Sequence, residues 1–141
     1  FLTTCTVCHT TLTTLNRTAR ADYDGDEIVE GIQDEVSGLL LALSTKIRSI
    51  DSTNVVGSGT TETDGVITVA AFGSFTAAKL AAANIDIRRA VYNHNLIAKD
   101  GSLGVHNAAF AVQVLQKTYS AISQLNGGDS FATAYPYAVL R

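Results

Sequence analysis

The sequence predicts a mainly α-helical protein, in which one long helix and an antiparallel helix hairpin form a small bundle between irregular N- and C-terminal segments. Apolar residues recur every three or four positions over residues 28–50. Two further stretches with this spacing, 74–98 and 105–126, are joined by a short turn. The chain has 141 residues, which suits one compact domain over residues 1–141.

The clearest helix is expected over residues 28–50. Asp24 or Asp26 can cap its N-terminus, and an acidic first turn is what the helix dipole favours. We expect Asp34 and Glu35 on the solvated face of this helix rather than as a catalytic pair. The stripe that defines the helix consists of Ile28, Ile32, Val36, Leu39, Leu43, Ile47 and Ile50.

The middle of the chain predicts a loop, a strand and a second helix. Residues 51–65 are rich in Ser, Thr, Gly and Asp, which is typical of an exposed loop. Residues 66–70 could form a short strand, whose edge could contact another chain. Gly73 then precedes the second helix, with Ser74 or Thr76 as its cap.

The last third predicts a turn, a third helix and an extended tail. Two glycines in residues 99–104 suit a tight turn, and a helix should follow from about Val105 until Gly127 ends it. The tail, residues 129–141, must pack on something to stay ordered. Its aromatic residues, Phe131, Tyr135 and Tyr137, are expected to pack on the bundle rather than to bind a partner.

The N-terminal segment carries the motif Cys5-Thr6-Val7-Cys8-His9. A Cys-x-x-Cys-His sequence is the attachment signature of a c-type haem. Each thiol can form a thioether with one haem vinyl group, and the histidine that follows can bind the iron as proximal ligand. The motif therefore predicts one covalent haem, with the helical bundle packed around it.

Other interpretations of the cysteines remain open. A redox dithiol expects a βαβ context, whereas a Thr-rich segment follows here. The two thiols could also hold zinc together with two of the three histidines, as part of a structural subunit. A plain disulfide, or two buried thiols, is the remaining alternative.

The chain contains no methionine, so the His/Met iron ligation common in single-haem cytochromes is impossible. The lack of an initiator also predicts a processed or trimmed chain. His94 and His106 are the histidines left as sixth ligands. His94 falls on the apolar stripe of the second helix, where a buried core residue is the simpler interpretation. His106 begins the third helix, from which it could reach across a cleft.

One segment around His106 resembles multihaem c-type cytochromes, including the cytochrome c nitrite reductase-like and doubled-CxxCH groups. The residues that carry the resemblance are 100–107 (DGSLGVHN), then Phe110-Ala111 and Val114-Leu115, with Arg89-Ala90-Val91-Tyr92-Asn93 before them. The resemblance implies that His106 is the distal haem ligand, from this chain or toward a neighbouring copy. The chain departs from the family at Ala108 and Phe110 and has a single attachment motif, so no catalytic residue is assigned.

A haem with two axial histidines has no open coordination position, so the expected function is electron transfer rather than catalysis. The expected partners are other cytochromes or redox proteins, with self-association or a filamentous haem array as a further expectation. The resemblance implies a periplasmic, cell-surface or extracellular location. The alternative within haem chemistry is an enzyme or gas sensor with an open sixth site.

Composition excludes two classes of partner. A net charge of −3 and 16% charged residues leave no basic patch for nucleic acid. No apolar run approaches the 18 residues of a membrane span. Asn16-Arg17-Thr18 matches a glycosylation sequon, a triplet that is common by chance.

Overall fold

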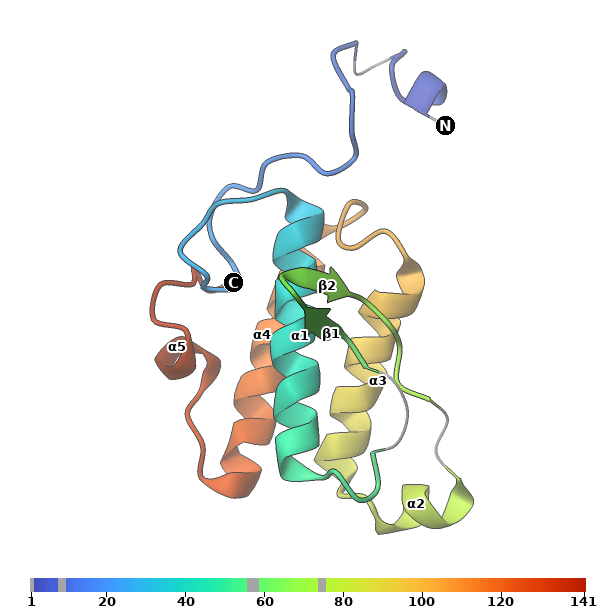
Figure 1. Cartoon of the computed structure of the whole chain (residues 1–141), viewed down its shortest axis with the longest axis vertical. Coiled ribbons are helices and arrows are strands. Elements are labelled where there is room, and N and C mark those ends of the chain that lie inside the picture. The colour runs from blue at the N-terminus through green and yellow to red at the C-terminus, as the bar shows by residue number, and fades with distance from the viewer. Residues whose placement is uncertain (1, 8–9, 56–58, 74–75) are drawn as a thin grey trace.

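The computed structural model describes residues 2–7, 10–55, 59–73 and 76–141, and within them three long helices form an up-down-up bundle (Figure 1). The central helix, α1 (Ile32–Ile50), contacts both α3 (Ile85–Asp100) and α4 (Ala108–Ser123), which also contact each other. The mainly α-helical prediction is confirmed. The shorter elements are η1 (Leu2–Thr4), β1 (Thr61–Thr63), β2 (Val66–Thr68), α2 (Ala77–Ala82), η2 (Gln124–Asn126) and α5 (Phe131–Ala134).

The bundle interior is filled by its own aliphatic side chains, because each long helix turns its apolar stripe inward. Among the described residues, these side chains occupy the centre of the bundle. The expectation that the bundle packs around a haem stays a prediction. The buried residues at the centre are Val36, Leu39, Leu40, Leu43 and Ile47 of α1, Ile87, Val91 and Ile97 of α3, and Val112, Leu115 and Ile122 of α4.

Helix α1 begins at Ile32, four residues later than the sequence predicts, and Gly31 is its N-cap residue. The residues just before Gly31 adopt backbone conformations that are not helical. Glu27 has a φ of +74°, which an α-helix does not allow. Asp24 and Asp26 therefore do not cap α1, and that expectation is wrong.

The second predicted helix is broken into α2 and α3. The Thr76 side chain caps α2 by accepting from the Lys79 N–H at 3.3 Å, whereas Ser74 lies outside the described residues. The extended backbone of Ala83 ends α2, and the Asn84 side chain then caps α3 by accepting from the Asp86 N–H at 2.8 Å. A helix-breaking cap at Asn84 thus interrupts an otherwise continuous periodic pattern.

The predicted strand belongs to a hairpin within the chain. Strand β2 pairs antiparallel with β1, with Thr61 opposite Thr68 and Thr63 opposite Val66. Asp64 and Gly65 connect the strands with φ values of +52° and +76°, as an Asp-Gly hairpin turn requires. The hairpin lies against α1 (Figure 1).

The C-terminal tail packs on the bundle through a short helix and an aromatic cluster. Phe131 in α5 is buried and meets the Tyr119 ring edge-on at 5.4 Å between centroids. Tyr135 stacks on Phe131 at 4.7 Å, whereas Tyr137 is exposed. The backbone N–H of Val139 donates to the carbonyl of Asp22 at 2.7 Å. This hydrogen bond joins the tail to the segment that precedes α1. The packing expectation is confirmed for Phe131 and Tyr135.

None of the helices that the structure describes is both long enough and apolar enough to cross a membrane.

Candidate functional site

The first three residues of the cysteine motif, 5–7, lie on an arm, residues 2–7 and 10–15, which projects from one end of the bundle (Figure 1). The Cys5 and Thr6 N–H groups donate to the Leu2 carbonyl at 2.9 and 3.0 Å, which closes a single turn. The Cys5 thiol is free and half-buried. Cys8 and His9 lie outside the described residues. Among the described residues, the turn around Cys5 is therefore held by hydrogen bonds within the turn and by none to the bundle.

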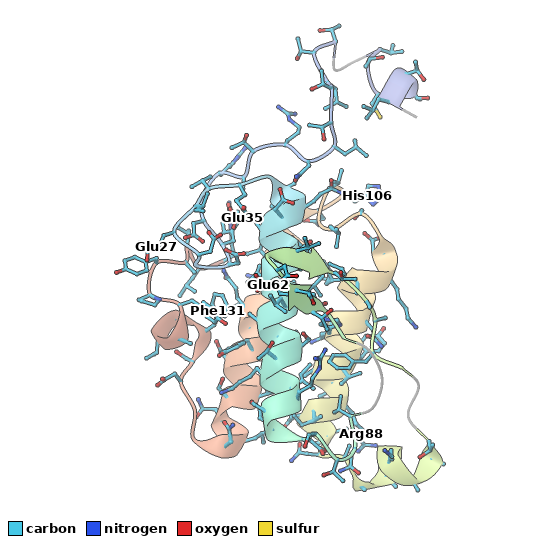
Figure 2. The ribbon with its side chains drawn as sticks, in the orientation of Figure 1. Glu27, Glu35, Glu62, Arg88, His106 and Phe131 are labelled. Atoms are coloured by element: carbon cyan, nitrogen blue, oxygen red, sulfur yellow. The ribbon has the colours of Figure 1, made fainter. Side chains whose placement is uncertain are left out.

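His106 lies at the end of the bundle from which the arm projects, and its imidazole points outward (Figure 2). Its side chain is 79% exposed, and its Nδ1 lies 3.9 Å from Oδ2 of Asp100. Hydrogen bonds from the Ser102 hydroxyl and N–H hold the pKa of Asp100 below its ordinary value, and the adjacent His106 acts in the same direction. Among the described residues, no hydrogen bond engages Nε2 of His106.

The α3–α4 turn that carries His106 is held close to α1. Gly104 has a φ of +85°, and a Cβ on it would lie 2.9 Å from Cγ2 of Val36. Glycine meets both demands, since it tolerates positive φ and lacks a Cβ. The Asn107 side chain then caps α4 by accepting from the Phe110 N–H at 3.1 Å. The helix therefore begins at Ala108, three residues after the predicted start, and His106 lies in the turn before it.

The surroundings of His106 are apolar on one side. A cleft of about 140 Å³ separates the end of α3 from the start of α4, and His106 lines it. Leu96 and Phe110, also in its lining, are 43% and 48% exposed. A flat apolar group approaching His106 would meet these two side chains.

His94 lies in the core, as its position on the apolar stripe predicts. It is fully buried, its Nε2 lies 2.9 Å from Oγ1 of Thr60, and its ring meets that of Phe72 edge-on at 4.9 Å. Burial lowers the pKa of His94 to about 4. The ring is therefore neutral at pH 7, and its Nε2 already pairs with the Thr60 hydroxyl.

A second site that the sequence interpretation overlooks is the acidic loop, residues 22–30, which packs on the start of α1. Glu35 of α1 is fully buried beneath it. Its Oε2 accepts from the N–H groups of Tyr23 and Asp24 at 2.6 and 3.3 Å, and its Oε1 accepts from that of Glu30 at 3.1 Å. The expectation of a solvated face is thus wrong for Glu35, although Asp34 is exposed.

Two other carboxylates of the loop, those of Asp22 and Asp24, also turn inward. Asp22 accepts from the N–H groups of Gly25 and Glu27 at 2.6 and 2.9 Å, and both Asp22 and Asp24 are buried. Burial, together with the negative charges of Asp26, Glu35 and Asp22, raises the pKa of Asp24 to about 7. The loop concentrates negative charge where water cannot fully solvate it.

Oxygen atoms from Asp22, Asp24 and Glu35 lie within 4.8 Å of one another, as do those from Asp24, Asp26 and Glu30. Such a set could hold a hard divalent cation, because calcium prefers carboxylate oxygens. The sequence signal is Asp22-x-Asp24-x-Asp26, the alternate-residue spacing of calcium-binding loops. In those loops the sixth residue is usually Gly at a sharp turn, and Glu27 takes this place here at φ +74°. Their usual Glu at position twelve is replaced by Gln33.

The sequon residue Asn16 is engaged at the start of α1. Its Nδ2 donates to Oδ2 of Asp34 at 2.5 Å, and its Oδ1 accepts from the Gln33 N–H at 2.9 Å. The amide nitrogen that a glycan would modify is thus used to hold the chain against the helix.

Comparisons with known proteins give no family for this chain. No protein-family model matches it, and neither the curated proteins nor the solved structures contain a significant match.

Proposed function

We propose that this chain is a c-type cytochrome that carries one haem on Cys5 and Cys8 and transfers electrons to other cytochromes or redox proteins. His9 and His106 would be the axial ligands. The observation that carries the proposal is the accessible imidazole of His106, at the end of the bundle from which the cysteine-bearing arm projects (Figure 2). The arm that carries Cys5 and the imidazole of His106 thus lie at the same end of the molecule, which supports the proposal.

The arm is long enough to bring a covalently held ring to His106. Asn16 is held to the start of α1 by its side-chain hydrogen bonds, and from there residues 10–15 can span up to about 20 Å when extended. The short turn around Cys5 is held by local bonds, so it can change position without breaking bonds to the bundle.

The surroundings of His106 suit an iron ligand. Asp100 faces Nδ1 and would favour the tautomer with the proton there, which leaves Nε2 free to bind metal. Leu96 and Phe110 would cover part of the ring and keep water from it. The haem would supply the redox-active iron, and two histidines would close both axial positions, which suits electron transfer.

His94 is the less favoured distal ligand. Binding through its Nε2 would require the loss of the Thr60 hydrogen bond and the opening of the core around Phe72. The same burial disfavours a zinc site that uses both His94 and His106, since one lies in the core and the other at the surface.

The proposal extends to partners and location. An exposed apolar stripe on α3, Ile85, Tyr92 and Leu96, continues to Phe110 and offers a contact surface for a redox partner or for another copy in a haem array. Attachment of haem c takes place outside the cytoplasmic membrane, so the proposed location is periplasmic, cell-surface or extracellular.

The test is the visible spectrum of the full chain, exported by a host with haem-attachment machinery, followed by a pyridine haemochrome assay. We expect one covalent haem per chain and a low-spin spectrum in both redox states. His106→Ala should convert the ferric protein to a high-spin form that binds cyanide, because it opens the sixth position.

The matched control is His94→Gln, which should leave the spectrum low-spin while lowering thermal stability. A colourless protein that contains zinc would overturn the haem proposal in favour of a structural subunit. A wild-type high-spin spectrum that cyanide changes would instead indicate an enzyme or sensor with an open site.

A further inference from the structure

The base of the arm holds a pocket of about 560 Å³, between residues 15–23 and the start of α4. Its apolar lining includes Leu15, Ile32 and Val105. The volume is within the range of about 300–1,000 Å³ usual for small-molecule sites. This pocket is separate from the acidic loop, whose carboxylates do not line it.

Three arginines, Arg17, Arg20 and Arg141, line the same pocket, and no acidic side chain does. Among the described residues, none of the three takes part in a salt bridge. Guanidinium groups pair with carboxylates through two parallel hydrogen bonds, which makes arginine the preferred residue for such recognition. The pocket therefore combines an apolar wall with unneutralised positive charge.

Tyr23 holds one of these arginines in place. Its ring is buried, its N–H donates to Glu35 at 2.6 Å, and its carbonyl accepts from Nε2 of Gln116 at 2.9 Å. The Arg141 guanidinium lies over this ring at 5.4 Å and donates to its hydroxyl at 2.8 Å. Arg141 is thus presented to the pocket by a rigid support.

We infer that this pocket binds an apolar ring that carries carboxylates, and that the arginines pair with those carboxylates. The occupant that the placement favours is the propionate-bearing edge of the haem held by the arm, so the identity of the occupant rests on the proposed function. Two features of the structure support that choice. Leu15 is the last residue of the arm and Arg17 lies just after it, and Gly104 lines both this pocket and the cleft of His106.

The test uses the full chain with Cys5→Ser and Cys8→Ser, so that no haem is attached and the outcome does not depend on covalent loading. Mesoporphyrin IX is titrated into this chain, and binding is followed by quenching of tyrosine fluorescence, since the chain has no tryptophan. The dimethyl ester of the same porphyrin is the matched ligand without charge. We expect the free acid to bind at least about tenfold more tightly than the ester, as charge-assisted pairs imply.

Arg17→Gln/Arg20→Gln should remove most of this preference for the free acid. The control, Lys79→Gln/Arg89→Gln, carries the same change of charge near α2 and the start of α3, far from the arm (Figure 1), and should keep the preference. Circular dichroism of the cysteine-free chain and its two double variants would check that each is folded. Equal binding of acid and ester, or equal loss in both double variants, would overturn the inference.

A haem-loaded wild-type chain distinguishes two sources of the carboxylate, namely the propionates of the attached haem and a free carboxylic acid. If the attached haem occupies the pocket, this chain should no longer bind free mesoporphyrin. Undiminished binding would instead assign the pocket to a free aromatic or aliphatic carboxylate. If the wild-type chain carries no haem at all, the proposed function fails. The titration of the cysteine-free chain still decides whether the pocket binds a ring that carries carboxylates.

Discussion

His94 and His106 are the two histidines that the structure describes, and they lie in opposite environments. His94 is fully buried between Thr60 and Phe72, with its pKa lowered to about 4 by burial. His106 is 79% exposed in a turn, with Asp100 as its neighbour. The first histidine supports the fold, and the second is available to a ligand.

The acidic residues at the start of α1 repeat this contrast. Glu35 is fully buried and accepts hydrogen bonds from three backbone N–H groups, whereas Asp34 beside it is exposed. The residue type is therefore a poor guide to role in this protein. What separates the members of each pair is whether a neighbouring segment covers the side chain.

The largest expected effect is on stability at His94. His94→Ala should lower the free energy of unfolding by about 3 kcal/mol, because it leaves a cavity and an unpaired Thr60 hydroxyl. His106→Ala should change it by less than about 0.5 kcal/mol, as expected for a surface site. Urea unfolding of the haem-free chain measures both. Comparable losses in the two variants would contradict the contrast between core and surface.

Glu35→Gln is expected to cost about 2 kcal/mol, because one of the carboxylate oxygens that accept backbone N–H groups is replaced by a donor. Asp34→Asn, one position away and exposed, serves as the control and should cost less than about 0.5 kcal/mol. Thermal unfolding of both variants at pH 7 gives the comparison. If Glu35→Gln is as stable as the wild type, the acidic loop does not depend on this carboxylate.

The pH dependence of stability should report Asp24. Its pKa of about 7 in the fold lies above the ordinary value of 3.8, so the folded chain binds this proton more tightly than the unfolded chain does. The stabilisation by the proton is complete below pH 4 and is lost as the pH rises from about 4 to 7. Asp24→Asn should therefore be more stable than wild type at pH 8, and the difference should shrink toward pH 5. A constant difference in melting temperature between wild type and Asp24→Asn from pH 5 to pH 8 would contradict the raised pKa of Asp24.

The smallest expected effect concerns divalent cations at the same loop. At pH 8, millimolar calcium should raise the melting temperature of the wild-type chain, because a cation offsets the repulsion among Asp22, Asp24 and Glu35. The increase should be smaller in Asp24→Asn. Magnesium, which demands a more regular oxygen geometry, provides the comparison ion. An equal rise with both ions in both proteins would indicate ionic screening instead of a site.

Much of the fold follows from periodicity. The inward stripes of α1, α3 and α4 are readable from the sequence, because burial selects apolar residues every three or four positions. The turn with Gly101 and Gly104, and Gly127 at the end of η2, are readable because glycine favours positive φ. The exact start of α1 is not readable in this way. Ile28 continues the stripe, yet its N–H donates to the Asp26 side chain at 2.8 Å, in the loop that precedes the helix.

The sequence by itself determined the three-helix pattern, the Cys5-x-x-Cys8-His9 motif and the two histidines that could provide a second ligand. The tertiary structure decided which histidine is accessible, because Thr60 and Phe72 come from a distant loop to cover His94. It also decided that Glu35 is buried, since the preceding loop folds back over α1, and that the tail brings Arg141 to the arm's base. These features depend on contacts between residues far apart in the chain, which no local pattern encodes.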